Sequence, residues 1–170
     1  MQHVALLAFD KEKCKPFFDR LTELFYEHHH SEQQNPDEYE KLLYMVKRPY
    51  DNNMLDMIDE WMGLGHREWR EETTREVKLA LYAIRYPDTL LLDSFTSKPR
   101  SDIRRLSSYL HFTHHTYAIW DEDTRKGLEK IGIKIPSTET ADPFIYGAYV
   151  SAIELLKDVA PFTCFLEHDV

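Results

Sequence analysis

Apolar residues recur along most of this chain at the spacing of amphipathic helices, at every third or fourth position. The most regular run follows i, i+3, i+4, i+7, i+8 and i+11 through Ile145, Ala148, Tyr149, Ala152, Ile153 and Leu156. Asp142 and Pro143 stand just before it, and aspartate followed by proline is a favoured helix start. Pro161 ends the pattern, so a core helix is predicted between these points.

The same periodicity predicts four further helices. Their approximate ranges are 17–25, 36–48, 51–62 and 66–85. Pro16 is expected in the first turn of the first of them, where a missing amide costs little. Gly63 is expected to stop the third. Arg67 belongs to the charged residues of 66–85, which are expected to form a solvated face.

The residues from 106 to 132 hold the densest chemistry of the chain. A helix is predicted from Ser101 with Leu106 and Leu110 inside, followed by a short extended connector at 117–120. Asp121 then has the place of an N-cap residue for a short helix that ends at Gly132. An aspartate at a helix start accepts amide hydrogen bonds and can also present a carboxylate oxygen to a ligand.

Together these patterns predict an all-α protein, a single domain over 1–170 with about eight short helices. Five glycines suggest few tight turns, and 42% hydrophobic residues with 13% aromatic ones exclude a disordered chain. No apolar run approaches the 18 residues of a membrane span, and the first residues are not rich in basic side chains, so neither a membrane span nor a signal peptide is expected. Cys14 and Cys164 lie at opposite ends without a CxxC pair, so reduced cysteines and a cytoplasmic location are expected.

The formal net charge of −9 at pH 7 argues against indiscriminate binding to nucleic acid, because that affinity rests on neutralising phosphates. A local basic groove is still compatible with an acidic total. Two basic clusters flank the central stretch: Lys98, Arg100, Arg104 and Arg105 before it, and Arg125, Lys126, Lys130 and Lys134 after it. Packed as an antiparallel pair, their helices would border one groove; ordinary surface cations are the alternative.

Histidines invite a metal hypothesis that their spacing does not favour. Residues 28–30 are three consecutive histidines, which point about 100° apart on a helix and cannot share one ion. His111 and His115 precede Asp121 and Asp123, so a metal-dependent hydrolase is a third hypothesis, but the H-x-x-H-H spacing matches no strong metal motif. We therefore predict no metal and no cofactor, and expect His111 to be hydrogen-bonded and partly buried.

Three short blocks carry a family resemblance: LHF at 110–112, AIWD at 118–121 and RKGL at 125–128. They resemble a pattern in small prokaryotic and phage proteins of mostly unknown function. That pattern is in turn remotely similar to the second half of the helix-hairpin-helix DNA glycosylase fold, in which an aspartate opens a helix after a short connector. The resemblance covers about one fifth of the chain and puts Asp121 in the place of that aspartate.

The chain also departs from that superfamily. The glycine-rich hairpin that grips DNA phosphates has no counterpart, since 97–100 contains no glycine. Arg105, Ser107 and Ser108 stand where the bifunctional enzymes have a nucleophilic lysine, and no iron–sulfur cysteine set exists. The resemblance therefore implies at most a monofunctional glycosylase or a relative that lost the chemistry.

The first functional hypothesis is a DNA-binding or DNA-processing protein built on the central stretch. Asp121 is its catalytic acid, and Tyr117 or Trp120 would stack on an unstacked base. Its phosphate contacts are Lys98, Arg100, Arg104, Arg105 and Arg125.

The alternative is a non-enzymatic acidic protein, of phage or defence-system type, that binds or inhibits a protein partner. Its support is the acidic balance and the abundance of tyrosine, tryptophan and phenylalanine, which are favoured in interfaces. Asp51, Asp56, Asp59 and Glu60 are its candidate acidic face.

Overall fold

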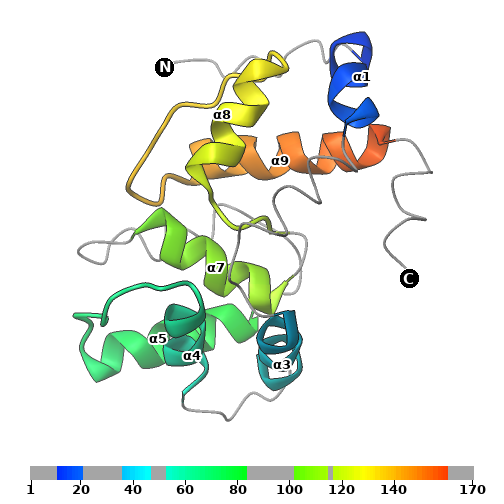
Figure 1. Ribbon diagram of the computed structural model, residues 1–170. Coiled ribbons are helices and arrows are strands. Elements are labelled where there is room, and N and C mark those ends of the chain that lie inside the picture. Colours follow the sequence, from blue (N-terminus) through cyan, green and yellow to red (C-terminus); the bar gives the residue numbers. More distant parts are fainter. Residues whose placement is uncertain (1–10, 21–35, 47–52, 84–101, 115–116, 161–170) are drawn as a thin grey trace.

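The computed structural model describes residues 11–20, 36–46, 53–83, 102–114 and 117–160. Within these ranges the chain is helical, and the prediction of an all-α fold with about eight helices is confirmed (Figure 1). The helices are α1 (Lys11–Asp19), α3 (Pro36–Val46), α4 (Met54–Trp61), α5 (Glu71–Ala83), α7 (Ile103–Thr113), α8 (Glu122–Lys130) and α9 (Pro143–Val159). No helix in the described ranges has the length and apolar character needed to cross a bilayer.

Helix α7 lies in the middle of the molecule. Figure 1 shows α3, α4 and α5 on one side of it and α1, α8 and α9 on the other. Seven of its eleven residues are buried, which is the burial expected of a helix covered on several faces. The buried apolar residues of α3, α4, α5, α7, α8 and α9 belong to one cluster. The residues at the two ends of α7 therefore lie between helices that pack on both sides of it.

Four tyrosines are the largest fully buried side chains among the described residues: Tyr109, Tyr117, Tyr146 and Tyr149. A buried tyrosine needs a partner for its hydroxyl. Tyr146 donates to the carbonyl of Ala118 at 2.8 Å, and Tyr149 donates to that of Ile119 at 3.0 Å. Helix α9 thus uses two core side chains to hold the connector that leads to α8.

Capping signals in the sequence located several helix ends correctly. Asp142 caps α9, where its Oδ1 accepts from the amides of Phe144 and Ile145 at 2.9 Å, and Pro143 is the first helical residue. Gly63 follows α4 with φ at 63°, a left-handed conformation that glycine adopts without strain. Asp121 caps α8 as predicted.

Other boundaries differ from the prediction. Helix α5 begins at Glu71 rather than near residue 66. Residues 64–70 are irregular, and within them Arg67 points into the core toward Asp59. Pro16 is the sixth residue of α1 and not part of its first turn. Residues 28–30, Asn35 and Cys164 lie outside the described ranges, while Cys14 is buried on α1.

Candidate functional site

The connector between α7 and α8 is held by hydrogen bonds from two helices, α7 and α9. Ser107 on α7 is fully buried, and its Oγ accepts from the Trp120 amide at 2.8 Å and donates to the Arg104 carbonyl at 3.0 Å. Tyr146 and Tyr149 of α9 donate to the carbonyls of Ala118 and Ile119, the two residues before Trp120. The start of α8 is therefore rigidly placed relative to the start of α7.

Asp121 occupies this joint and is exposed. Its Oδ2 accepts from the Thr124 amide at 2.7 Å and from the Thr124 hydroxyl at 2.9 Å. Its Oδ1 makes no hydrogen bond to any described residue. The carboxylate thus caps α8 with one oxygen and leaves the other available to a ligand.

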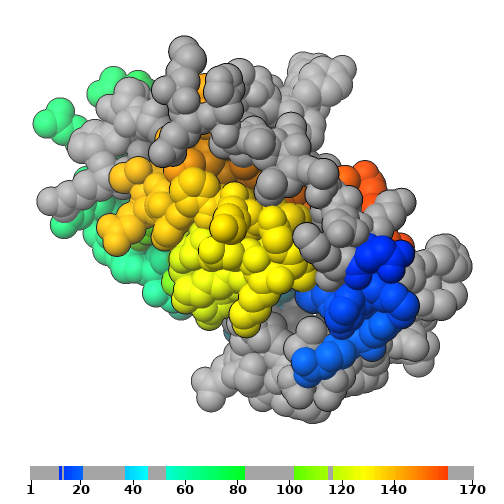
Figure 2. Space-filling view, turned by 90° about the horizontal axis from the view of Figure 1, so that it is seen from above, coloured from blue at the N-terminus to red at the C-terminus, as the bar shows by residue number. Residues whose placement is uncertain are grey.

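An open cleft of about 850 Å³ lies beside this carboxylate. The start of α7 contributes Asp102 and Arg104, the start of α8 contributes Trp120 to Glu122 and then Lys126, and residues 137–140 form the opposite wall. Figure 2 shows α8 and the segment that follows it side by side on one face of the molecule. The cleft has the volume usual for a ligand site, roughly 300–1,000 Å³.

Two long-range contacts hold residues 137–140 in place as a wall of the cleft. Thr140 pairs with Asp102 in an isolated antiparallel bridge, where the Ile103 amide donates to the Glu139 carbonyl at 3.2 Å. Ser137 donates its hydroxyl to Oε2 of Glu122 at 3.2 Å. Nothing in the local sequence of residues 137–140 signals their pairing with the start of α7, so this wall was not predicted from the sequence.

Acidic groups outnumber basic ones in the cleft. Four of its described lining residues carry carboxylates, Asp102, Asp121, Glu122 and Glu139, against two cations, Arg104 and Lys126. Glu122 is already engaged by Ser137 and by Arg125, and Lys126 pairs with Asp123 at 3.2 Å. The cleft therefore presents a net negative surface with one unengaged guanidinium, that of Arg104.

Arg125 lies beneath this surface rather than on it. Its side chain is only 11% exposed, with Nε donating to Glu122 Oε1 at 2.7 Å and Nη1 donating to the Ile135 carbonyl at 2.8 Å. It ties α8 to the segment that forms the wall of the cleft. The geometry gives it a structural place, which does not favour the predicted phosphate contact.

We expect Arg125→Ala to lower the free energy of unfolding by about 1–3 kcal/mol, because it leaves the Ile135 carbonyl without its donor. Amide hydrogen exchange over 133–141 should accelerate in the same variant. Lys130→Ala, on the exposed end of α8, is the matched control and should change stability by less than about 0.5 kcal/mol. An unchanged exchange rate together with weaker DNA binding would instead support the phosphate-contact hypothesis.

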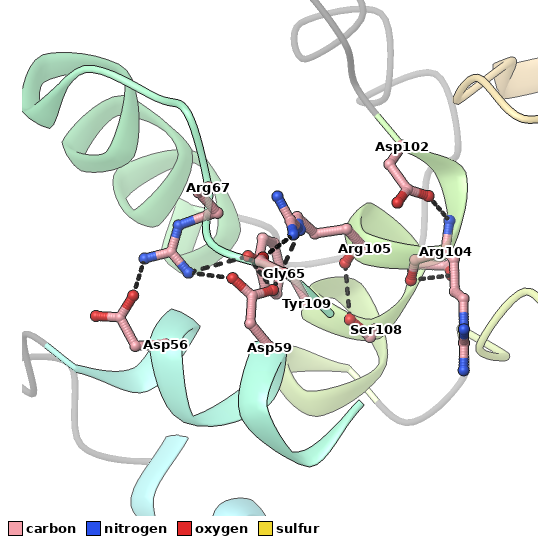
Figure 3. A network of polar contacts seen from close by, with 10 residues as sticks. Asp56, Asp59, Gly65, Arg67, Asp102, Arg104, Arg105, Ser108 and Tyr109 are labelled. Atoms are coloured by element: carbon pink, nitrogen blue, oxygen red, sulfur yellow. Dashed lines mark hydrogen bonds and ion pairs between the residues drawn. The ribbon is translucent and has the colours of Figure 1, made fainter. Parts of the chain in front are cut away.

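Arg105 points away from the cleft into a buried polar network (Figure 3). Its Nε lies 3.3 Å from Asp59 Oδ1, and its guanidinium donates to the Gly65 carbonyl. Arg67 donates to Asp59 Oδ2 at 2.5 Å and also pairs with Asp56. Tyr109 completes the network by donating to Asp59 Oδ1 at 2.6 Å.

This network corrects two expectations. Asp59 is 6% exposed and Arg67 is 8% exposed, so neither contributes to the solvated or acidic faces predicted for them. Asp59 follows the buried Ile58 and lies one turn after Leu55, which puts it on the buried face of α4. That position is the one sequence signal that pointed to a buried carboxylate. Asp56 is exposed, and Asp51 lies outside the described ranges.

Burial raises the pKa of the core tyrosines. Desolvation raises the pKa of Tyr149 to about 12, and it raises that of Tyr109 well above the usual value, with a further increase from the hydrogen bond to Asp59. Desolvation also raises the pKa of Tyr146. All three hydroxyls therefore stay protonated and donating at neutral pH.

The shift at Tyr149 predicts a loss of stability in alkali. Its folded pKa lies above the unfolded value of 10, so its contribution is complete below pH 10 and is lost as the pH rises toward 12. We expect the free energy of unfolding to fall by about 1.4 kcal/mol per pH unit in that window from this group. Urea unfolding from pH 8 to 11.5 measures it, and Tyr149→Phe should show a shallower decline. An equal decline in both proteins would contradict the assignment.

Trp120 is a core residue in this structure. It is 4% exposed, and its ring centre lies 4.8 Å from that of Tyr149. Tyr117 is fully buried beside Tyr146, with ring centres 6.2 Å apart. Neither ring presents a face to solvent, so neither is placed to stack on an unstacked base.

The remaining predicted residues divide between the cleft and elsewhere. Arg104, Trp120 and Asp121 line one cleft, whereas Arg105 and Arg125 make contacts outside it. Lys98 and Arg100 lie outside the described ranges.

His111 is partly buried and hydrogen-bonded, as predicted. Its Nε2 lies 2.8 Å from the Tyr39 hydroxyl, and its Nδ1 lies 2.7 Å from the Tyr117 carbonyl. Over the described part of the chain, no three His, Cys, Asp or Glu side chains are grouped to hold a metal ion. His115 lies outside that part.

Comparison with protein-family models, curated proteins and solved structures gives no match to this chain. The likeness to DNA glycosylases therefore stays a prediction from the sequence.

Proposed function

We propose that this is a non-enzymatic binding protein that holds a segment of a partner protein in the cleft between the starts of α7 and α8. The observation that supports this proposal is the presence of polar groups in the cleft that make no hydrogen bond to a described residue. Asp121 Oδ1 and the guanidinium of Arg104 make no hydrogen bond to a described residue, yet both line one concave surface. Surfaces with pre-placed donors and acceptors bind partners with little reorganisation.

The charge of the cleft supports a protein partner over nucleic acid. Two of the arginines expected to contact phosphates, Arg105 and Arg125, are engaged by carboxylates inside the protein. The acidic lining would repel a phosphate backbone, whose binding depends on cations.

Site-specific photo-crosslinking tests this function. A benzoylphenylalanine in place of Lys126, at the edge of the cleft, should crosslink the full-length protein to one partner in a stoichiometric complex. The same group in place of Arg75, exposed on α5, is the control and should not capture that partner. The same set of captured proteins from both positions would contradict the proposal.

One observation favours a second candidate, a DNA-processing protein. Asp121 and Arg104 line the same cleft, which is the arrangement required for a carboxylate to act beside a bound phosphate.

For this second candidate we expect base release from duplex DNA containing modified bases. The release should fall by at least a hundredfold in Asp121→Asn, because the amide still caps α8 but cannot act as an acid or a base. Circular dichroism checks that both proteins are folded. Equal release, or no release from either protein, excludes the catalytic role.

A further inference from the structure

The connector that leads to α8 is held by buried side chains rather than by its own backbone. Residues 118–120 make no backbone–backbone hydrogen bond to a described residue. Instead, two fully buried tyrosines of α9 donate to the first two carbonyls, and Ser107 of α7 accepts from the Trp120 amide. A segment held in this way has few alternative positions, and its position depends on each of the side chains that hold it.

Ser107 differs from the two tyrosines because it links the two helix starts that border the cleft. Its hydroxyl donates to the Arg104 carbonyl at 3.0 Å and accepts from the Trp120 amide at 2.8 Å. Arg104 and Trp120 line the cleft, as does Asp121 directly after Trp120. Ser107 itself is fully buried and is not a lining residue. Any effect of Ser107 on binding in the cleft must therefore act through the positions of these three residues.

We propose that Ser107 is a positioning residue of the cleft, and that its hydroxyl sets where Asp121 stands relative to Arg104. The inference rests on the proposed function, because it concerns the same cleft. A serine hydroxyl can donate one hydrogen bond while it accepts another, and Ser107 uses both capacities. Without this hydroxyl the Trp120 amide would be buried without an acceptor, and the free-energy cost of an unpaired amide favours displacement of the connector.

The next residue of α7 provides a matched control. Ser108 is also fully buried, and its hydroxyl donates to the Arg105 carbonyl three residues back at 2.8 Å (Figure 3). Ser107 makes the equivalent bond to Arg104, but no described residue of the connector donates to Ser108. A change to alanine therefore removes the same atom from the same helix in both cases, and only the change at Ser107 releases the connector.

Amide hydrogen exchange and nuclear magnetic resonance of the full-length protein test this placement without a partner. Relative to the amides of α9, Ser107→Ala should accelerate exchange of the Trp120 amide by about tenfold or more, because that amide loses its acceptor. The resonance of the Thr124 amide, which donates to Asp121, should also shift because Asp121 moves. Ser108→Ala should change the relative exchange rate by less than about twofold and leave the Thr124 resonance in place. Equal acceleration in both variants would overturn the inference.

The crosslinking experiment at Lys126 tests the consequence for binding. With benzoylphenylalanine in place of Lys126, Ser107→Ala should lower the yield of the crosslinked complex by about fivefold or more, because the cleft is no longer held in its binding geometry. Ser108→Ala should lower the yield by less than about twofold. Circular dichroism checks that both variants are folded at the temperature used. Equal yields from the two alanine variants would contradict the positioning role.

The two proposals fail in different ways. If no partner is captured at Lys126 while the Trp120 amide exchanges faster only in Ser107→Ala, the placement of the connector by Ser107 stands and the proposed function is wrong. If one partner is captured equally by the parent protein and by both alanine variants, the proposed function stands and the positioning role is wrong.

Discussion

Arg67→Ala should lower the free energy of unfolding by about 3 kcal/mol or more, the largest effect expected of any single charged residue in this protein. The guanidinium is 8% exposed and joins Asp59 to Tyr109 and Asp56. Its loss leaves the buried Asp59 with fewer partners, and breaking one side of a buried ion pair typically costs about 3–5 kcal/mol. Urea unfolding at pH 7 measures the change, and Arg75→Ala on the exposed face of α5 is the control.

A double-mutant cycle sharpens this prediction. Asp59→Leu combined with Arg67→Met replaces both charges by apolar side chains of similar size. In the double variant neither Asp59 nor Arg67 is left buried without the other, while Arg105 and Tyr109 lose Asp59 in the single and the double variant alike. The double variant should therefore lose less stability than the two single variants added together, by at least about 1 kcal/mol. Strictly additive losses would show that the two residues do not act as a pair.

Trp120→Ala is expected to cost about 3–5 kcal/mol, the range for truncating a large aromatic side chain in a core. The ring is buried against Tyr149, whose hydroxyl donates to the Ile119 carbonyl, so the indole helps to position the connector before Asp121. Trp120→Phe, which keeps an aromatic ring, should cost distinctly less. Thermal and urea unfolding give both values.

The outcome separates two roles for Trp120. If Trp120 is a core residue, its truncation lowers the free energy of unfolding. Binding in the cleft then weakens only because the connector is less well held. A base-stacking residue would instead leave stability nearly unchanged and weaken the binding of single-stranded DNA. The second result would restore the nucleic-acid hypothesis.

Local signals in the sequence were sufficient for much of the fold. Asp142 before Pro143, Asp121 before a charged helix, and Gly63 after an apolar run each specify a helix end through bonds within a few residues. The apolar periodicity gave the all-α class for the same reason, because one helix face must be buried. These features need no knowledge of distant residues.

Distant pairings escaped prediction because they depend on the assembled fold. Arg67 stands in a charged run and resembles a surface residue, until α4 and α7 bring Asp59 and Tyr109 to it. Arg104 and Arg105 are neighbours in sequence but face opposite directions, one toward the cleft and the other toward Asp59. Counting basic residues therefore predicted one groove, where the structure divides them between a cleft and a core.

The candidate site was partly predictable. Asp121 was singled out because a capping aspartate with a second, unused oxygen follows from its position alone. The wall formed by residues 137–140 could not be predicted. Its position depends on the bridge between Thr140 and Asp102 and on the hydrogen bond from Arg125 to the Ile135 carbonyl.

The claim that the cleft is the binding site is tested most directly by amide chemical-shift mapping. The full-length protein is titrated with the purified partner that the crosslinking experiment identifies. Binding in the cleft predicts that the largest shifts fall on residues 102–104, 120–126 and 137–140, and that Asp121→Asn diminishes them at equal partner concentration. Shifts concentrated on α3, α4 and α5, and unchanged by Asp121→Asn, would contradict the assignment of the cleft as the binding site.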